Sequence, residues 1–417
     1  MYCFRKGNGI GSTCGLKGLL ISLCCCSPIF GFPQLLHLVQ PAETDARIET
    51  FNNNHLIYFN PDALKKDKLF LFLPGTGGVP AVYREILKVA SNLGYHSVGL
   101  MYPNELAINI ACALTLDTTC HSRARKEIIT GQDMHPLYSV DSINSISNRL
   151  FQLLRYLSDH FPSENWDTFI SGDSIHWQKL IVAGHSQGAG HAGFLGTIRQ
   201  IDRAILIAGM DWIPLFMRPA DWHSVSGKTP AENYYGFAHE MDERVNFERL
   251  QYAWQASGMM NFGEWVSVDS FEIPYNQSHI LSTRAIPFGD PERYHNAPVV
   301  DFNTPRNEHG DLSFVPVWEY LIDFEETVTY AKTGETTSRK DFHIYPNPAF
   351  DKCHIVCENH STPHSVWILD AIGNKTLLHH RINCNFSLQT SHLPPGIYFL
   401  QFRTNNDIQT VKLTIAN

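Results

Sequence analysis

The chain has 417 residues, of which 43% are hydrophobic and 18% are charged. This length and apolar content suffice for one large core and a smaller second unit. The formal net charge of -9, without basic runs, argues against nucleic acid or an anionic membrane surface as a partner.

The N-terminal segment has the pattern of an export signal. Basic residues precede an apolar run over residues 18–32, which is too short to span a bilayer comfortably. We therefore predict a signal peptide over residues 1–31, with an uncertain cleavage point, and no other segment is apolar enough to be transmembrane.

The cysteines outside this signal fall into two groups. Export into an oxidising compartment favours a disulfide between Cys112 and Cys120, with two free buried thiols as the alternative. Cys353, Cys357 and Cys384 lie near the end, and the sequence leaves their pairing open. No group of residues has metal-ligand spacing, so neither a metal nor an organic cofactor is expected.

The first elements predict a βαβ unit. Residues 45–60 favour strands with a turn at 52–54. The apolar run 68–73 ends in glycines, as expected of a strand buried on both faces of a parallel sheet. A helix is predicted over 80–93, and another strand over 95–101. The fold class is therefore α/β, with a mostly parallel central sheet.

The pattern then breaks and resumes. Residues 104–135 are predicted to form an insertion loop at the carboxyl edge of the sheet. A helix is expected within 140–160, capped by Ser139 or Asp141. Four further strands and a last helix complete the domain, at 179–183, 203–208, 233–238, 297–302 and 315–325.

The composition changes after residue 330. Residues 331–341 are polar and aperiodic, which predicts a linker between a catalytic domain over 42–330 and a second domain over 342–417. Short alternating runs separated by turn signals predict that the second domain is a small all-β sandwich.

Residues 184–188, Gly-His-Ser-Gln-Gly, follow a buried strand and open a segment of small residues. This is the strand–turn–helix context of a nucleophile elbow, in which Ser186 sits on a strained turn at the N-terminus of a helix. The backbone N–H of Gln187 is the natural first donor to an oxyanion.

A second oxyanion donor is expected from the glycine loop at residues 73–78. Thr76 is the first candidate and Gly77 the second. A phosphate-binding loop is the alternative, but this loop lacks the Gly-Lys-[Ser/Thr] ending.

A serine nucleophile needs a base and an acid that orients the base, in the chain order serine, acid, histidine. Asp242 follows the strand predicted at 233–238, and Glu240 and Asp211 remain alternative acids. His309 follows the strand predicted at 297–302 and is the candidate base.

These motifs make residues 68–325 similar to the α/β-hydrolases, in particular to secreted bacterial esterase- or lipase-like members. The similarity rests on PGTGG at 74–78, GHSQGAG at 184–190, HEMDERV at 239–245 and EHG at 308–310. It implies a Ser186-Asp242-His309 triad and hydrolysis through an acyl-enzyme, and it identifies no substrate.

Residues 343–417 resemble the C-terminal sorting domain of type IX secretion cargo in Bacteroidota. The matching segments are 345–348, 369–374, 396–400 and the ending 410–416. The resemblance implies export through the periplasm to the surface or medium, with the type IX translocon and sorting machinery as partners. A carbohydrate-binding β-sandwich is the alternative for this segment.

The sequence thus predicts a secreted serine hydrolase that cleaves a small-molecule or polymer-linked carboxylic ester, or a related acyl bond. A serine peptidase shares the same triad and fold. A non-catalytic binding or surface protein on a hydrolase scaffold is a third possibility. Acyl length, the physiological substrate and the oligomeric state cannot be derived from the sequence.

Overall fold

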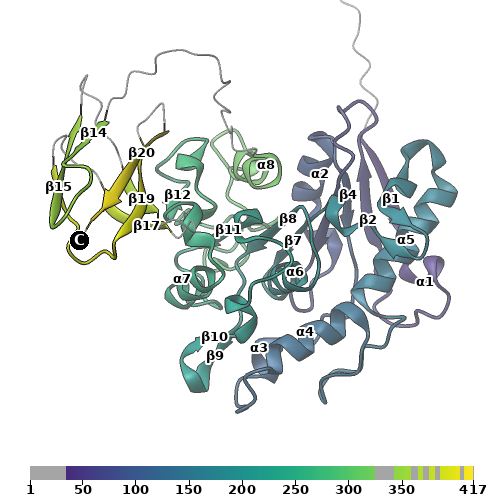
Figure 1. Ribbon diagram of the computed structural model, residues 1–417. Coiled ribbons are helices and arrows are strands. Elements are labelled where there is room, and N and C mark those ends of the chain that lie inside the picture. Colours follow the sequence, from purple (N-terminus) through teal and green to yellow (C-terminus); the bar gives the residue numbers. More distant parts are fainter. Residues whose placement is uncertain are drawn as a thin grey trace, which may run out of the picture.

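The computed structural model describes residues 34–324, 342–357, 365–369, 375–380, 386–403 and 408–416 (Figure 1). The predicted signal peptide at 1–31 and the predicted linker at 331–341 lie outside these ranges. Within the described chain, no helix combines the length and apolar character that crossing a membrane requires.

A mostly parallel nine-stranded sheet organises the first and larger part. Its order is β1-β2-β4-β3-β7-β8-β11-β13-β12; β2 pairs antiparallel with both β1 and β4, and all other pairs are parallel. The strands are β1 (Leu35–Val39), β2 (His55–Phe59), β3 (Leu69–Leu73), β4 (His96–Gly99), β7 (Leu180–His185), β8 (Arg203–Ile207), β11 (Tyr234–His239), β12 (Val266–Ser267) and β13 (Ile280–Thr283).

Helices cover both faces of this sheet because its central strands are apolar on both faces. In β3, Leu69, Leu71 and Leu73 pack into one core, whereas Phe70 and Phe72 pack into the other. The leucine side is covered by α4 (Cys120–Thr130), α5 (Ile146–His160), α6 (Gln187–Ile198) and α7 (Phe247–Ala256). The phenylalanine side is covered by α2 (Arg84–Asn92) and α8 (Val315–Asp323). The predicted α/β class is confirmed at this level.

Several predicted boundaries differ from the structure. The first strand is β1, so the sheet begins before residue 42, and residues 45–51 form no strand. The insertion at 104–135 holds α3 (Ile108–Ala111) and α4 rather than loop alone. Helix α5 begins at Ile146 and is capped by Ser145, whose hydroxyl accepts the N–H of Asn148, not by Ser139 or Asp141.

The strand predicted at 297–302 is wrong. The N–H groups of Val299 and Val300 instead donate to the Asn296 carbonyl oxygen at 3.1 and 2.9 Å, which makes helical turns. Pro298 lies inside this run and has no N–H to give to a sheet. The sheet strand that follows β11 in chain order and pairs with it is β13.

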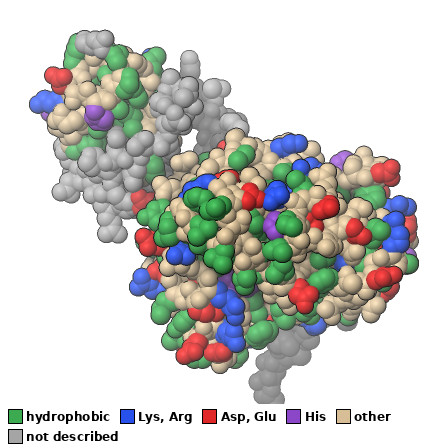
Figure 2. All heavy atoms as spheres, turned by 90° about the horizontal axis from the view of Figure 1, so that it is seen from below, with side chains coloured by type: hydrophobic (Ala, Val, Ile, Leu, Met, Phe, Trp, Pro, Cys, Tyr) green, Lys and Arg blue, Asp and Glu red, His purple; other side chains and the backbone are tan. Residues whose placement is uncertain are grey.

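The small elements α1 (Pro41–Thr44), β5 (Ile170–Ser171), β6 (Ser174–Ile175), β9 (Trp212–Ile213) and β10 (Arg218–Pro219) lie outside this sheet. On the face shown in Figure 2, Lys and Arg side chains are interspersed with Asp and Glu side chains. That face presents no broad basic patch.

The C-terminal part forms two antiparallel sheets. One has the order β14 (Phe342–Tyr345), β15 (Lys352–Cys357), β18 (Phe386–Gln389), and the other β17 (Lys375–His380), β16 (Ser365–Leu369), β19 (Gly396–Arg403), β20 (Ile408–Ile415). Phe342 stacks on Phe402 in the shared core, with ring centroids 4.4 Å apart. Cys353 is a buried free thiol there; Cys384 and the side chain of Cys357 lie outside the described residues.

Candidate active site

Ser186 occupies a strained turn between β7 and α6. Its backbone has φ 54° and ψ -116°, a region that non-glycine residues rarely adopt. The flanking glycines make the turn possible, because a Cβ on Gly188 would lie 2.0 Å from the Leu73 carbonyl oxygen. A Cβ on Gly184 would lie 2.2 Å from the carbonyl carbon of Gly188. The turn therefore has the geometry of a nucleophile elbow.

Asp242 follows β11 and is paired with His295. One carboxylate oxygen accepts the backbone N–H groups of Arg244 and Val245, both at 2.8 Å. The other lies 2.7 Å from Nδ1 of His295. The two side chains are only 2% and 4% exposed, so the pair is shielded from water. A carboxylate that already accepts two N–H groups favours the tautomer with the proton on Nδ1, which leaves a lone pair on Nε2.

The backbone of His295 is held as firmly as its ring. Its N–H donates to Glu243 at 2.8 Å, and its carbonyl oxygen lies 2.9 Å from Nε2 of His185. A further contact, from Nε2 of His239 to the Ala285 carbonyl oxygen at 3.0 Å, joins the end of β11 to the loop after β13. The loop after β11 and the loop after β13 are thus tied at several points.

Ser186 and His295 line one cavity with a volume of about 630 Å³. The glycine loop, the start of α6 and the short helix α3 supply much of the remaining wall: Gly75, Thr76, Gly77, Gly78, Gln187, Ala107, Ile108, Asn109 and Ile110. The cavity lies where β3, β7 and β8 end, as is common for ligand sites of parallel sheets.

The predicted oxyanion donors differ in availability. The Gly77 N–H donates to the Asn104 carbonyl oxygen at 3.0 Å, so Gly77 is not a free donor. Within residues 34–324 the N–H groups of Thr76 and Gln187 have no hydrogen-bond partner, and both residues line the cavity. The Thr76 hydroxyl also donates to the Gln187 side-chain oxygen at 3.3 Å, which holds the two residues together.

The predicted base, His309, lies elsewhere. Its side chain is 76% exposed, its ion-pair partner is Glu308 at 3.5 Å, and it does not line the cavity with Ser186. The expectation failed because it followed the false strand at 297–302. His295 is the first histidine after β13, so the short run Ile280–Thr283 was the signal that could have identified it.

The alternative acids make other contacts. Asp211 forms a buried bidentate pair with Arg125, at 2.5 and 2.6 Å, and accepts the indole N–H of Trp222 at 2.7 Å. Burial, the largest single influence, raises the pKa of Asp211, but the charge and hydrogen bond of Arg125, together with contributions from His121 and His223, hold the pKa below its ordinary value. Glu240 instead accepts from Ser282 and Arg284.

His185 bridges the glycine loop and the His295 loop. Because its Nε2 faces a carbonyl oxygen, that nitrogen carries the proton, and Nδ1 accepts from the Tyr83 hydroxyl at 3.0 Å. The Tyr83 oxygen in turn accepts the Gly75 N–H at 3.3 Å. Burial, with a smaller contribution from His295, lowers the pKa of His185 to about 3, so the ring is neutral near pH 7.

The predicted disulfide between Cys112 and Cys120 is confirmed, with Cα atoms 5.8 Å apart. It joins the end of α3, which lines the cavity, to the start of α4. His135 lies beside it, with Nε2 3.1 Å from the Cys120 sulfur. These three residues are close enough to hold a metal ion, but both sulfurs are consumed in the disulfide and offer no thiolate.

Comparison with protein families identifies the second part of the chain. Residues 343–416 match the family described as the secretion system C-terminal sorting domain. This segment is a type IX secretion sorting domain. It indicates that the protein is secreted or attached to the cell surface, and it implies interaction with the type IX secretion machinery. A comparison of the chain with curated proteins found no match.

Proposed function

We propose that the exported protein is a serine hydrolase of the α/β-hydrolase fold that cleaves a carboxylic ester, with Ser186 as nucleophile, His295 as base and Asp242 as the orienting acid. One observation carries the proposal. The His295 ring, bonded to Asp242 at 2.7 Å, lines the same cavity as a serine on a strained strand-to-helix turn.

The arrangement of strands supports this assignment. Ser186 follows β7, Asp242 follows β11 and His295 follows β13, three strands that lie within one run of parallel pairs. Carboxyl ends of parallel strands meet at one edge, and the chain order serine, acid, histidine is that of α/β-hydrolases.

The proposed chemistry proceeds in two halves. The Ser186 hydroxyl attacks the acyl carbonyl carbon while Nε2 of His295 takes its proton, and the Asp242 carboxylate stabilises the imidazolium. The N–H groups of Gln187 and Thr76 donate to the oxyanion. His295 then protonates the leaving alcohol, and an acyl-enzyme remains. Water attacks this ester with His295 again as base, which releases the acid and restores the Ser186 hydroxyl.

The test is covalent labelling and hydrolysis with the full chain. A fluorophosphonate probe should label Ser186, and Ser186→Ala should abolish labelling. With p-nitrophenyl acetate, Ser186→Ala and His295→Gln should each lower kcat by at least about 10³-fold.

His309→Gln is the matched control, since it removes an exposed histidine, and it should leave kcat within about twofold, the scale of a surface substitution. Labelling of another residue, or a larger loss in His309→Gln than in His295→Gln, would overturn the assignment. If the protein cleaved aminoacyl anilides faster than acyl esters, the result would support a serine peptidase and contradict the proposed esterase.

A further inference from the structure

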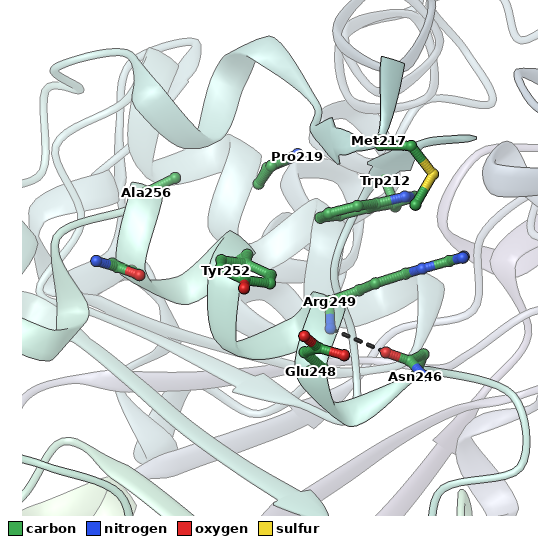
Figure 3. Close-up of a pocket in the computed structure, with 9 residues that line it drawn as sticks. Trp212, Met217, Pro219, Asn246, Glu248, Arg249, Tyr252 and Ala256 are labelled. Atoms are coloured by element: carbon green, nitrogen blue, oxygen red, sulfur yellow. Dashed lines mark hydrogen bonds between the residues drawn. The ribbon is translucent and has the colours of Figure 1, made fainter. Parts of the chain in front are cut away.

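Figure 3 shows a second cavity, of about 680 Å³. Some of its lining residues are close in sequence to residues that line the Ser186 cavity. The second cavity is formed by the β9–β10 hairpin and by α7 with its N-terminal cap. Its lining residues are Trp212, Met217, Pro219, Asn246, Glu248, Arg249, Tyr252, Gln255 and Ala256. Its volume is within the range of sites for small organic ligands.

The two cavities are built on the same two chain segments. Gly209 and Met210 line the Ser186 cavity, and Trp212 lines the second one. Likewise, Val245 lines the first cavity and Asn246 the second.

Asn109, which lines the Ser186 cavity, contacts a residue of each cavity in the segment 209–212. Its side chain donates to the Met210 carbonyl oxygen at 3.0 Å and accepts the Trp212 N–H at 3.4 Å. Lining residues of the two cavities are thus one or two positions apart along both segments, which makes the second cavity a candidate subsite for a substrate whose ester lies at Ser186.

The lining combines aromatic surface with polar groups. The rings of Trp212 and Tyr252 lie 6.4 Å apart between centroids, and the Arg249 guanidinium lies 5.5 Å from the Trp212 ring. Figure 3 shows Met217 beside Trp212 and Arg249 extended alongside it. The indole N–H of Trp212 is buried and has no hydrogen-bond partner among the described residues. Tyr252 is 51% exposed, so much of its ring is free to contact a ligand.

This lining selects among ligand classes. A long acyl chain would desolvate Asn246, Glu248 and Gln255 without giving them hydrogen bonds, which is costly. A strongly charged ligand would find no charge of opposite sign to offset its desolvation, because the charges of Glu248 and Arg249 in the lining cancel. A neutral sugar ring has apolar C–H faces for aromatic side chains and hydroxyls for amides and carboxylates.

We propose that this cavity binds a neutral sugar residue of the substrate, so that the enzyme acts on carbohydrate esters. The inference rests on the proposed esterase function of Ser186. The exposed Tyr252 ring contacts a face of the sugar, and the largely buried Trp212 adds only the part of its ring that lines the cavity. The hydroxyls meet Glu248, Gln255 and the amide N–H groups of Asn246, whose oxygen already accepts the Arg249 N–H.

The experiment compares two acetate esters, acetylated xylo-oligosaccharide and p-nitrophenyl acetate, with the full-length protein. The measured quantity is the ratio of kcat/KM for the sugar ester to kcat/KM for the phenyl ester. Tyr252→Ala and Gln255→Ala should each lower this ratio about tenfold, mainly through KM. Tyr252→Phe, which keeps the ring, should retain most of it. Phe271→Ala removes an exposed aromatic outside both cavities and should leave the ratio unchanged.

Binding supplies the second readout. Xylotetraose should bind to the Ser186→Ala protein in calorimetry, and Tyr252→Ala should weaken that binding by a similar factor. Unchanged ratios in both variants would overturn the sugar subsite while leaving the esterase intact. If Tyr252→Ala and Gln255→Ala lowered kcat/KM for p-nitrophenyl palmitate but not for the sugar ester, the cavity would be an acyl site instead. If Ser186→Ala still hydrolysed both acetate esters at the parent rate, the proposed function itself would be refuted.

Discussion

The bridge through His185 makes a prediction that separates positioning from packing. His185→Leu places an apolar side chain at this buried position and removes both hydrogen bonds of the imidazole. The Tyr83 O–H donor and the His295 carbonyl oxygen then lose their buried partner, although the Tyr83 oxygen still accepts the Gly75 N–H. Each such group costs about 1–3 kcal/mol, so the free energy of unfolding should fall by about 2–6 kcal/mol.

Catalysis should fall as well, because the His295 carbonyl oxygen loses its only side-chain donor among the described residues. A displacement of about 1 Å at a catalytic group costs about 10²-fold in rate, so kcat on p-nitrophenyl acetate should drop by that order while KM changes less. Tyr83→Phe is the comparison variant, since it spares the bond from His185 to His295, and its kcat should fall less.

The pH dependence gives the bridge an independent signature. In the unfolded chain His185 takes a proton near its ordinary pKa of 6.5, whereas burial lowers the folded pKa to about 3. The unfolded state therefore binds more protons in this window, and the contribution of His185 to stability falls by about 1.4 kcal/mol per unit as the pH drops from 6.5 toward 3. His185→Leu lacks this titration. The difference in free energy of unfolding between the parent and His185→Leu, measured in urea, should therefore become smaller as the pH is lowered. A gap that stays constant or widens, or a kcat within threefold of the parent, would refute the reasoning.

Three further predictions follow. The double variant Cys112→Ala/Cys120→Ala removes a disulfide with a sequence separation of 8, so its free energy of unfolding in urea should be about 2.5 kcal/mol lower than that of the oxidised parent. Equal stability of the two proteins would contradict a stabilising role of the disulfide. Arg125→Met leaves the buried Asp211 carboxylate without its cation and should lower the free energy of unfolding by about 3–5 kcal/mol. Because the folded pKa of Asp211 is lowered, the part of this loss that depends on its ionisation should disappear as the pH falls below 3.8. Arg125→Met/Asp211→Leu should recover much of the loss, and a double variant less stable than Arg125→Met would argue against the ion pair. Gly188→Ala should abolish soluble expression or esterase activity, since its Cβ would meet a backbone carbonyl oxygen at 2.0 Å; an active, stable variant would show that the turn relaxes.

Much of the architecture could be predicted from local patterns. The buried strands predicted at 68–73, 179–183, 203–208 and 233–238 are short, mostly apolar runs followed by proline, glycine or histidine, and each has a sheet strand within two residues of its predicted ends. The elbow around Ser186 is equally local, because its strain is accommodated by adjacent glycines. The paired cysteines are eight positions apart, and export makes their oxidation the expected state.

The tertiary structure decided what depends on distant partners. The contact between Asp242 and His295 spans 53 positions, and the residues that directly flank His295 do not distinguish it from the other twenty of the 21 histidines. The strand that directs the chain to it, β13, has only four residues, and its membership in the sheet is set by pairing with β11 and β12. The occupation of the Gly77 N–H by Asn104 was likewise invisible in the sequence. Local sequence determines strained turns and buried runs because their energetics involve neighbouring residues, whereas the choice among chemically identical side chains is made by packing across the whole sheet.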